Sequence, residues 1–227
     1  MSKKRIGVLL SGCGVNDGSE IHEAVLTLAA LDKADADIVC MAPDRNQMDV
    51  IDHRTGKPVS ERRNVLTEAA RIARGDIRNV AEVTPDELDG LVMPGGFGAA
   101  KNLSTFARDG AGCTVDPDVS RLLRGMRAAG KPIAALCIAP VILGALFGKE
   151  LSPEVTIGTD PGTAKALETM GARHRKAGTT EVVVDGKNRL VTTPCYMSAT
   201  RIREIDEGVQ KAVRELLKLV ETSPAGV

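Results

Sequence analysis

Residues 132–140 read Pro-Ile-Ala-Ala-Leu-Cys-Ile-Ala-Pro, and this stretch decides the fold. The apolar run 132–136 predicts a strand buried on both faces, since a half-exposed strand would alternate apolar and polar side chains. Pro140 suits the first turn of a helix, where its missing N–H removes no hydrogen bond. The stretch therefore predicts a strand that turns abruptly at Cys137 into a helix.

The same alternation continues outward in both directions. Strands are expected at 6–10, 38–41, 76–83, 91–93 and 155–157, with a hairpin of 182–184 and 190–192, and the main helices at 20–33, 61–74, 117–129, 160–170 and 198–221. Apolar strands separated by helices are typical of a mostly parallel sheet covered on both faces. We predict an α/β three-layer sandwich.

One domain is expected over 1–221, because no repeat or low-complexity linker interrupts the chain, and residues 222–227 are expected to form a flexible tail. The closing helix carries apolar residues at helical spacing and is expected to pack on the sheet through them. These residues are Ile202, Ile205, Val209, Val213, Leu216 and Val220.

Composition excludes several classes of protein. Lysine plus arginine number 30, as do aspartate plus glutamate, and aromatic residues are 2%. The chain thus lacks the basic excess and the stacking rings of a nucleic-acid-binding protein. No apolar run approaches the roughly 18 residues that cross a membrane, and the start of the chain is not typical of a signal peptide. Five cysteines without a pairing pattern then predict reduced thiols in the cytoplasm.

Cys137 is the strongest candidate for chemistry. A cysteine between a strand and a helix N-terminus has the position of a nucleophile elbow, and the helix favours its thiolate, so we expect a depressed pKa. The N–H groups of Ile138 and Gly96 are expected to stabilise an oxyanion beside it. The alternative is a small buried hydrophobe, as most free cysteines are. Cys13, which also follows a strand, is a second but weaker candidate nucleophile.

No cofactor or metal is expected. The three histidines have no metal-ligand spacing, and no Cys-x-x-Cys occurs. The glycines at 12 and 14 begin a dinucleotide fingerprint, but Asp17 occupies the position of its third glycine and would repel a pyrophosphate.

Three motifs together resemble the ElbB group, the isoprenoid-biosynthesis-associated glyoxalases of the PfpI-like branch in the class I glutamine amidotransferase-like superfamily. They are Ser-Gly-Cys-Gly-Val-Asn-Asp-Gly-Ser-Glu-Ile-His-Glu (11–23), Pro-Gly-Gly-Phe-Gly-Ala-Ala-Lys-Asn-Leu-Ser (94–104) and Cys-Ile-Ala-Pro (137–140), supported by 156–160 and 191–197. The resemblance implies a flavodoxin-like sandwich, a homodimer and a cofactor-independent glyoxalase with Cys137 as nucleophile. Gly95, Phe97, Cys13 and Asn102, which lie in these motifs, are expected to contact the substrate.

The sequence also departs from its relatives. Peptidases of the superfamily carry histidine directly after the cysteine, where this chain has Ile138, and its amidotransferases need a late histidine, whereas none follows His174 here. A cysteine and a carboxylate remain, the pair that the superfamily's glyoxalases use.

Glu20 and Glu23 compete for the role of that carboxylate. With Ser19 as N-cap, both lie in the first helical turn. At about 100° per residue, Glu20 shares a stripe with the bulky apolar residues expected to face the sheet, and Glu23 lies on a more lateral face. We therefore expect Glu20 beside Cys137, with its pKa raised by burial and by the thiolate.

The resulting hypothesis is that Cys137 attacks a small dicarbonyl such as glyoxal and that the products are 2-hydroxy acids (glycolate from glyoxal). The alternative is a non-enzymatic stress-response or redox-sensing protein that uses the same cysteine.

Overall fold

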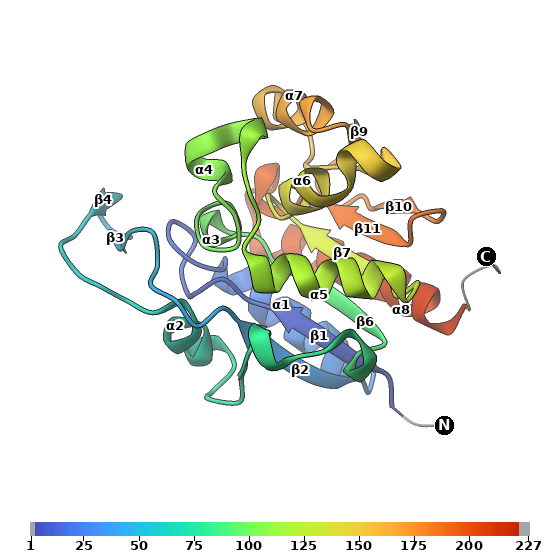
Figure 1. The fold of residues 1–227 in the computed structure, drawn as a ribbon, viewed down its shortest axis with the longest axis horizontal. Helices are drawn as coiled ribbons and strands as arrows, with labels where there is room; N and C mark the ends of the chain where they lie inside the picture. The colour runs from blue at the N-terminus through green and yellow to red at the C-terminus, as the bar shows by residue number, and fades with distance from the viewer. Residues whose placement is uncertain (1–2, 223–227) are drawn as a thin grey trace.

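The computed structural model describes residues 3–222, and within them a seven-stranded sheet runs through the molecule in the order β10-β11-β7-β6-β1-β2-β5 (Figure 1). All pairs in this sheet are parallel except β10 with β11. The strands are β1 (Arg5–Leu9), β2 (Asp37–Ala42), β5 (Arg78–Asn79), β6 (Gly90–Met93), β7 (Ile133–Leu136), β10 (Val183–Asp185) and β11 (Leu190–Thr193). The predicted mostly parallel sheet is confirmed.

Helices cover both faces of this sheet. From β1 the chain steps outward to β2 through α1, and in the opposite direction it steps from β6 to β7 through α5. Right-handed crossovers in opposite directions place their helices on opposite faces, and Figure 1 shows α5 in front with α1 and α8 behind. The helices are α1 (Ile21–Lys33), α2 (Val65–Ile72), α3 (Phe97–Lys101), α4 (Phe106–Asp109), α5 (Pro117–Ala128), α6 (Pro140–Leu151), α7 (Pro161–Thr169) and α8 (Ile202–Glu221).

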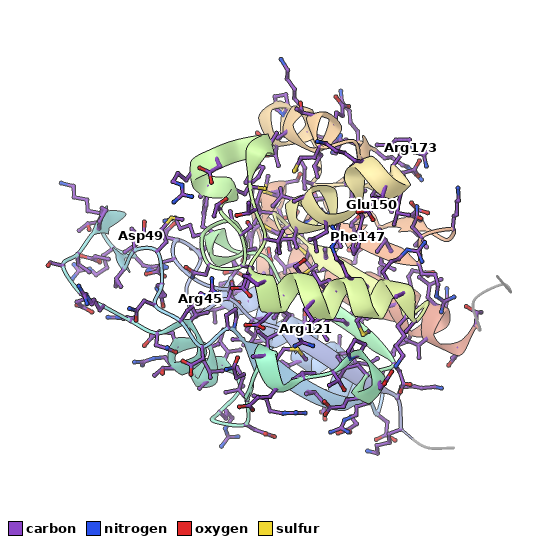
Figure 2. All side chains as sticks on the ribbon, in the orientation of Figure 1. Arg45, Asp49, Arg121, Phe147, Glu150 and Arg173 are labelled. Carbon is purple, nitrogen blue, oxygen red and sulfur yellow. The ribbon has the colours of Figure 1, made fainter. Side chains whose placement is uncertain are left out.

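Helices α5 and α6 are joined on the front face by one arginine. The Arg124 guanidinium lies 5.8 Å from the centre of the Phe147 ring, and its Nη1 lies 3.1 Å from the Glu150 carboxylate. Figure 2 labels Phe147 and Glu150, both on α6. Phe147 is only 2% exposed, and the Arg124 guanidinium, which also pairs with Glu150, helps to shield its ring from solvent.

Two expected strands are shorter or placed elsewhere. The stretch 76–83 pairs with the sheet only at Arg78–Asn79, because the Asn79 side chain accepts from the Ala81 N–H and starts a 3₁₀ turn. The stretch 155–157 contributes only its first residue to β8 (Glu154–Val155), which pairs with β9 (Arg173–His174) outside the main sheet. A small hairpin of β3 (Ile51–Asp52) and β4 (Lys57–Pro58) completes the strands.

The closing helix α8 packs against α1 and the sheet largely as predicted. Ile205, Val209, Val213 and Leu216 are buried, whereas Ile202 is 51% exposed and Val220 is half-buried. Ile202 does not take part in the packing of α8 because it is the first residue of the helix. Of the tail expected at 222–227, residues 223–227 lie outside the described part of the chain, and one domain over 1–221 stays a prediction. None of the helices within 3–222 combines the length and the hydropathy needed to cross a bilayer.

Two isoleucines one turn apart test the packing of α8. Replacing Ile205, which is completely buried, with alanine leaves a cavity, and we expect the free energy of unfolding to fall by about 2–5 kcal/mol. Ile202→Ala is the matched control and should change it by less than about 1 kcal/mol. Urea denaturation followed by circular dichroism measures both, and equal losses would contradict the packing described here.

Candidate active site

Cys137 occupies a strained turn between β7 and α6. Its φ is 58°, a left-handed conformation that a residue with a side chain adopts only where the surrounding structure enforces it. The Cys137 N–H donates to the Thr193 carbonyl oxygen at 3.0 Å, which continues the β7–β11 pairing to the turn, and Pro140 begins the helix three residues later. The predicted strand, elbow and helix are confirmed.

Two backbone amides converge on the Cys137 sulfur. The N–H groups of Gly96 and Ile138 both favour the thiolate form of Cys137 and so act to lower the pKa of its thiol. Gly96 has a φ of 95°, and a Cβ atom there would lie 2.4 Å from the Glu20 nitrogen, so only glycine fits this close turn. These are the two amides expected to form an oxyanion site.

The carboxyl group beside Cys137 belongs to Glu23, and the expectation of Glu20 is wrong. Glu23 is completely buried, and its Oε2 and the Cys137 sulfur lie on either side of Gly95, 2.7 and 2.9 Å from the point where a Cβ atom of that residue would be. Its Oε2 accepts from the Gly95 N–H at 2.8 Å, and its Oε1 accepts from the Tyr196 N–H at 3.2 Å. Two segments far apart in the sequence thus fix this carboxyl group.

Glu20 instead caps the helix. Its backbone is extended, and its Oε2 accepts from the Glu23 N–H at 2.8 Å, so the helix begins one residue later than predicted. The buried face of α1 consists of Glu23, Ala24, Thr27, Ala30 and Leu31. This face is rich in small residues that allow close packing, whereas our prediction followed the bulkier apolar side chains.

Burial dominates the electrostatics of the pair. It raises the pKa of Glu23 to about 7, with a smaller contribution from the charge of Glu20. Burial, and then the Glu23 carboxylate, raise the pKa of the Cys137 thiol well above its usual range, although the amides of Gly96 and Ile138 oppose the shift. The predicted depression of the thiol pKa is therefore wrong. The resting pair is a thiol beside a carboxyl that changes charge near neutral pH.

Gly95 makes the contact between the two side chains possible. A Cβ atom at this position would lie 2.3 Å from Cys137 Cβ and 2.7 Å from Glu23 Oε2, too close for any residue but glycine. Gly95 was expected to contact substrate, and here it supplies a hydrogen bond and space to Glu23.

A cavity of about 460 Å³ opens beside Cys137. Predicted site residues Gly96, Phe97, Cys137 and Ile138 line it, and its other walls are Val15, Ala100, Phe106, Ala107, Asp160, Thr163, Tyr196 and Met197. Cys137 is 7% exposed and contributes to the wall of this cavity.

Sequence reasoning missed the contribution of the segment after β11. Tyr196 holds Glu23 through its backbone, and its hydroxyl lies 2.8 Å from His22 Nδ1, which in turn lies 3.7 Å from Glu20 Oε1. Cys195 is fully buried, and the charges of Glu23 and Cys137 raise its pKa in addition to burial. The available signal was topological, because β11 ends beside β7 and residues that follow adjacent parallel strands meet at one edge of the sheet.

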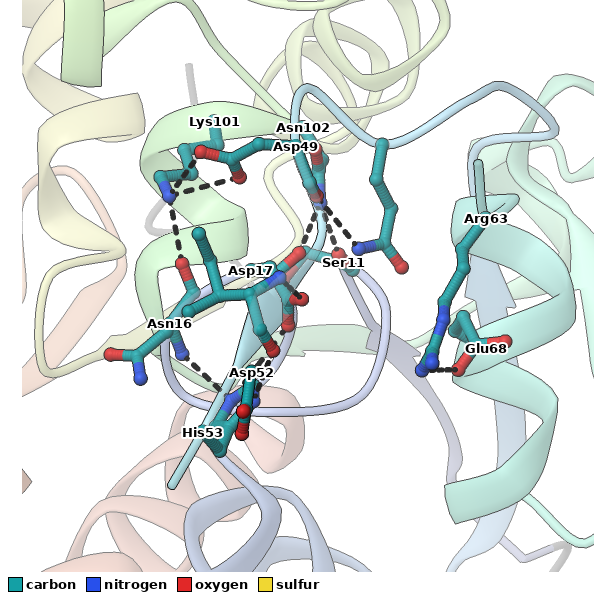
Figure 3. A network of polar contacts seen from close by, with 12 residues as sticks. Ser11, Asn16, Asp17, Asp49, Asp52, His53, Arg63, Glu68, Lys101 and Asn102 are labelled. Carbon is teal, nitrogen blue, oxygen red and sulfur yellow. Dashed lines mark hydrogen bonds and ion pairs between the residues drawn. The ribbon is translucent and has the colours of Figure 1, made fainter. Parts of the chain in front are cut away.

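Asn102 and Cys13 lie outside the cavity, contrary to expectation. The Asn102 side chain donates to the carbonyl oxygens of Ser11 and Asp17, both at 2.8 Å, and accepts from the Met48 N–H at 3.0 Å (Figure 3). It therefore fastens the loop 11–18, which carries the cavity residue Val15. Burial raises the pKa of the Cys13 thiol, and the charges that also act on this thiol include those of Glu68 and Arg71 on α2.

Lys101 fastens the same loop from the other side. Its ammonium donates to the Asn16 carbonyl oxygen at 2.9 Å and to both Asp49 oxygens at 2.9–3.0 Å (Figure 3). Nearby, His53 Nε2 accepts from the Asn16 N–H at 3.2 Å. Within 3–222 no three His, Cys, Asp or Glu side chains gather as metal ligands would.

Comparison with known proteins gives consistent matches. The sequence model of the DJ-1/PfpI family matches residues 12–200. The rat protein named "ES1 protein homolog, mitochondrial" is 45% identical, over 96% of this chain and 84% of its own length. The human "Glutamine amidotransferase-like class 1 domain-containing protein 3, mitochondrial" is 46% identical, over 95% and 83%. A crystal structure of an isoprenoid biosynthesis protein with amidotransferase-like domain from Ehrlichia chaffeensis aligns with a TM-score of 0.88 and 36% identity, over 94% of this chain and 99% of that one.

The raised pKa of Glu23 predicts a specific pH dependence of stability. A carboxyl whose pKa rises from 4.5 to about 7 on folding favours the folded state below about pH 4.5, and this advantage is lost as the pH rises through about 7. Between those limits the loss is about 3 kcal/mol. We expect the free energy of unfolding of the wild type to fall by this amount relative to Glu23→Gln, measured by urea denaturation across the interval.

Glu20→Gln serves as the control. It keeps an oxygen that can cap α1 and leaves Glu23 buried, so most of the pH dependence should remain, reduced only by the smaller contribution of the Glu20 charge. If Glu23→Gln showed the full pH dependence of the wild type, the burial of an ionisable carboxyl at this position would be disproved.

Proposed function

The chain belongs to the DJ-1/PfpI family, and from this premise we propose that it is a cofactor-independent glyoxalase that converts glyoxal-type dicarbonyls to 2-hydroxy acids. The observation that carries the proposal is the contact of the Cys137 sulfur with the Glu23 carboxyl and two backbone amides at the base of a cavity. A nucleophile, a proton carrier and an oxyanion site are the groups that this reaction needs.

The first step forms a hemithioacetal. The Cys137 sulfur attacks the aldehyde carbon of glyoxal while the Glu23 carboxylate accepts the thiol proton. A thiol with a raised pKa is a poor nucleophile until a base removes its proton, and Glu23 has the contact to do so. The negative charge moves to the former aldehyde oxygen, which the N–H groups of Gly96 and Ile138 stabilise.

The second step moves a proton between the two carbons. Glu23 first gives the thiol proton to the hemithioacetal oxygen and becomes a carboxylate again. It then takes the hydrogen of the carbon that carries sulfur as a proton and returns it to the neighbouring carbon, while the hydroxyl proton of the first carbon passes to the oxygen of the second. The first carbon is oxidised to a thioester and the second is reduced to an alcohol, so no external oxidant or reductant is required. Water then cleaves the thioester, which releases glycolate and restores the Cys137 thiol; glyoxal plus water equals glycolic acid.

Further proposals rest on the motifs quoted above. The motifs at 11–23, 94–104 and 137–140 support a place in the ElbB group within the family, and a homodimer is proposed on the same resemblance. Five free thiols support a reducing compartment such as the cytoplasm, whereas the rat and human relatives are named as mitochondrial. The alternative of a redox sensor is disfavoured by the burial and raised pKa of Cys137, since oxidation by peroxide follows thiolate character and exposure.

Substitutions of Cys137, Glu23 and Glu20 test whether Cys137 is the nucleophile and Glu23 is the proton carrier. Cys137→Ala should abolish the conversion of glyoxal to glycolate in the absence of glutathione, and Glu23→Gln should lower kcat/KM by about 10²–10⁴-fold because the proton carrier is lost. Glu20→Gln keeps the helix cap and should have a smaller effect. Glycolate is measured directly, and reversible oxidation of Cys137 without any turnover would favour the redox sensor instead.

The pH profile tests the protonation state of Glu23. Because the carboxylate is the form that accepts the thiol proton, kcat/KM should rise as the pH passes about 7. The residual activity of Glu23→Gln should lack this rise. A wild-type rate that falls over the same interval would show that the protonated carboxyl is the active form.

A further inference from the structure

The aromatic residues of this chain are concentrated at one place. The sequence contains three phenylalanines, one tyrosine and no tryptophan. Phe97, Phe106 and Tyr196 line the cavity beside Cys137, and only Phe147 lies in the core. Phe97 is 52% exposed, although burial would be favourable for a ring of this size. A chain so poor in aromatic residues that places three of its four at the cavity presents a surface for an apolar group.

The charge of the cavity restricts what can bind. Among the described residues that line it, Asp160 is the only charged one, and no lysine, arginine or histidine contributes. The Asp160 carboxylate caps α7 by accepting from the Thr163 N–H at 2.7 Å, and this hydrogen bond lowers the pKa of Asp160 and keeps it ionised at neutral pH. An anionic substituent would therefore meet a negative charge. The Lys101 ammonium, 5.9 Å from the centre of the Phe97 ring, is already paired with Asp49 at 2.9 Å.

The cavity is also larger than glyoxal requires. A volume of about 460 Å³ falls in the range that accommodates ring-sized ligands, whereas glyoxal has only four non-hydrogen atoms. Apolar residues, among them Val15, Ala100 and Met197, form most of the remaining wall. Bound glyoxal would leave this surface in contact with water.

We propose that the walls formed by Phe97, Phe106 and Met197 are a subsite for the apolar substituent of a neutral 2-oxoaldehyde that carries an aryl or branched alkyl group. The proposal rests on the proposed function, since the aldehyde carbon of such a substrate is the one that Cys137 attacks. The reaction balances as before: the aldehyde carbon becomes a carboxylate, the ketone carbon becomes an alcohol, and one water is consumed.

The test compares three aldehydes that differ in size and charge. Phenylglyoxal should have a kcat/KM about 10-fold or more above that of glyoxal, because transfer of its ring into the subsite stabilises the transition state. The 4-carboxy derivative of phenylglyoxal has the same ring with a negative charge and should lose most of this advantage. The 2-hydroxy acid product is measured, and Cys137→Ala corrects for reaction of the aldehydes with arginine side chains.

Alanine variants test whether the preference for phenylglyoxal depends on the phenylalanine rings of the cavity. Phe97→Ala and Phe106→Ala should each lower the ratio of kcat/KM for phenylglyoxal to kcat/KM for glyoxal by about 5–10-fold, since the larger substrate gains more from contact with these rings. Val25→Ala, an exposed apolar residue of α1 outside the cavity, is the control and should leave this ratio unchanged. Turnover of glyoxal without preference for phenylglyoxal, or without loss in the phenylalanine variants, would overturn the subsite and leave the proposed function standing.

A binding measurement tests the subsite even if the protein is not a glyoxalase. If neither aldehyde is converted, binding still tests the subsite, because Tyr196 is the only tyrosine and its fluorescence reports on the cavity wall. Cyclohexanol should then produce a saturable change in fluorescence that is weakened by Phe106→Ala, whereas cyclohexanecarboxylate should not. Absence of any change with cyclohexanol would overturn the subsite as well.

Discussion

The Cys137 sulfur and the Glu23 carboxyl are in contact because position 95 has no side chain. Any larger residue there would occupy the space between them, and its N–H would no longer reach Glu23 at 2.8 Å. The contact explains the properties of the site: a carboxyl with a pKa near neutrality, a thiol held protonated, and two amides directed at sulfur. A buried carboxyl without these partners would be costly, so the site depends on each of them.

Glycines also allow close approach between the loop that follows β1 and the segment that follows β6. A Cβ atom at Gly98 would lie 2.6 Å from the Gly18 Cα, and one at Gly96 would lie 2.4 Å from the Gly18 carbonyl oxygen. The loop after β1 and the loop after β6 therefore pack backbone against backbone, and the buried Asn102 satisfies the carbonyl groups that this packing leaves inside. Residues that look suited to substrate binding in the sequence are used here to hold the loops together.

The sequence was sufficient for the parts of the structure that local physics determines. Apolar runs predicted the strands, and the strand, cysteine and proline of 132–140 predicted the elbow, because each depends on neighbours in the chain. The choice between Glu20 and Glu23 depended on which face of α1 packs inward, and the small residues on that face are a weaker signal in the sequence than the bulkier apolar ones. The pKa of Cys137 depended on burial by α1 and the segment after β11, which sequence neighbours do not reveal.

The hydrogen bond between Glu23 and the Tyr196 amide joins residues 173 positions apart in the sequence. A ribosome that makes this chain completes α1, the elbow and the nucleophile long before it reaches Tyr196. Until β11 is added beside β7, Cys137 lacks its edge partner and Glu23 lacks one of its two amides, so the thiol and the carboxyl have the properties of solvated groups. Assembly of the reactive pair is thereby delayed until the segment after β11 has been made, and a chain that stops before Tyr196 would carry the cysteine without its chemistry.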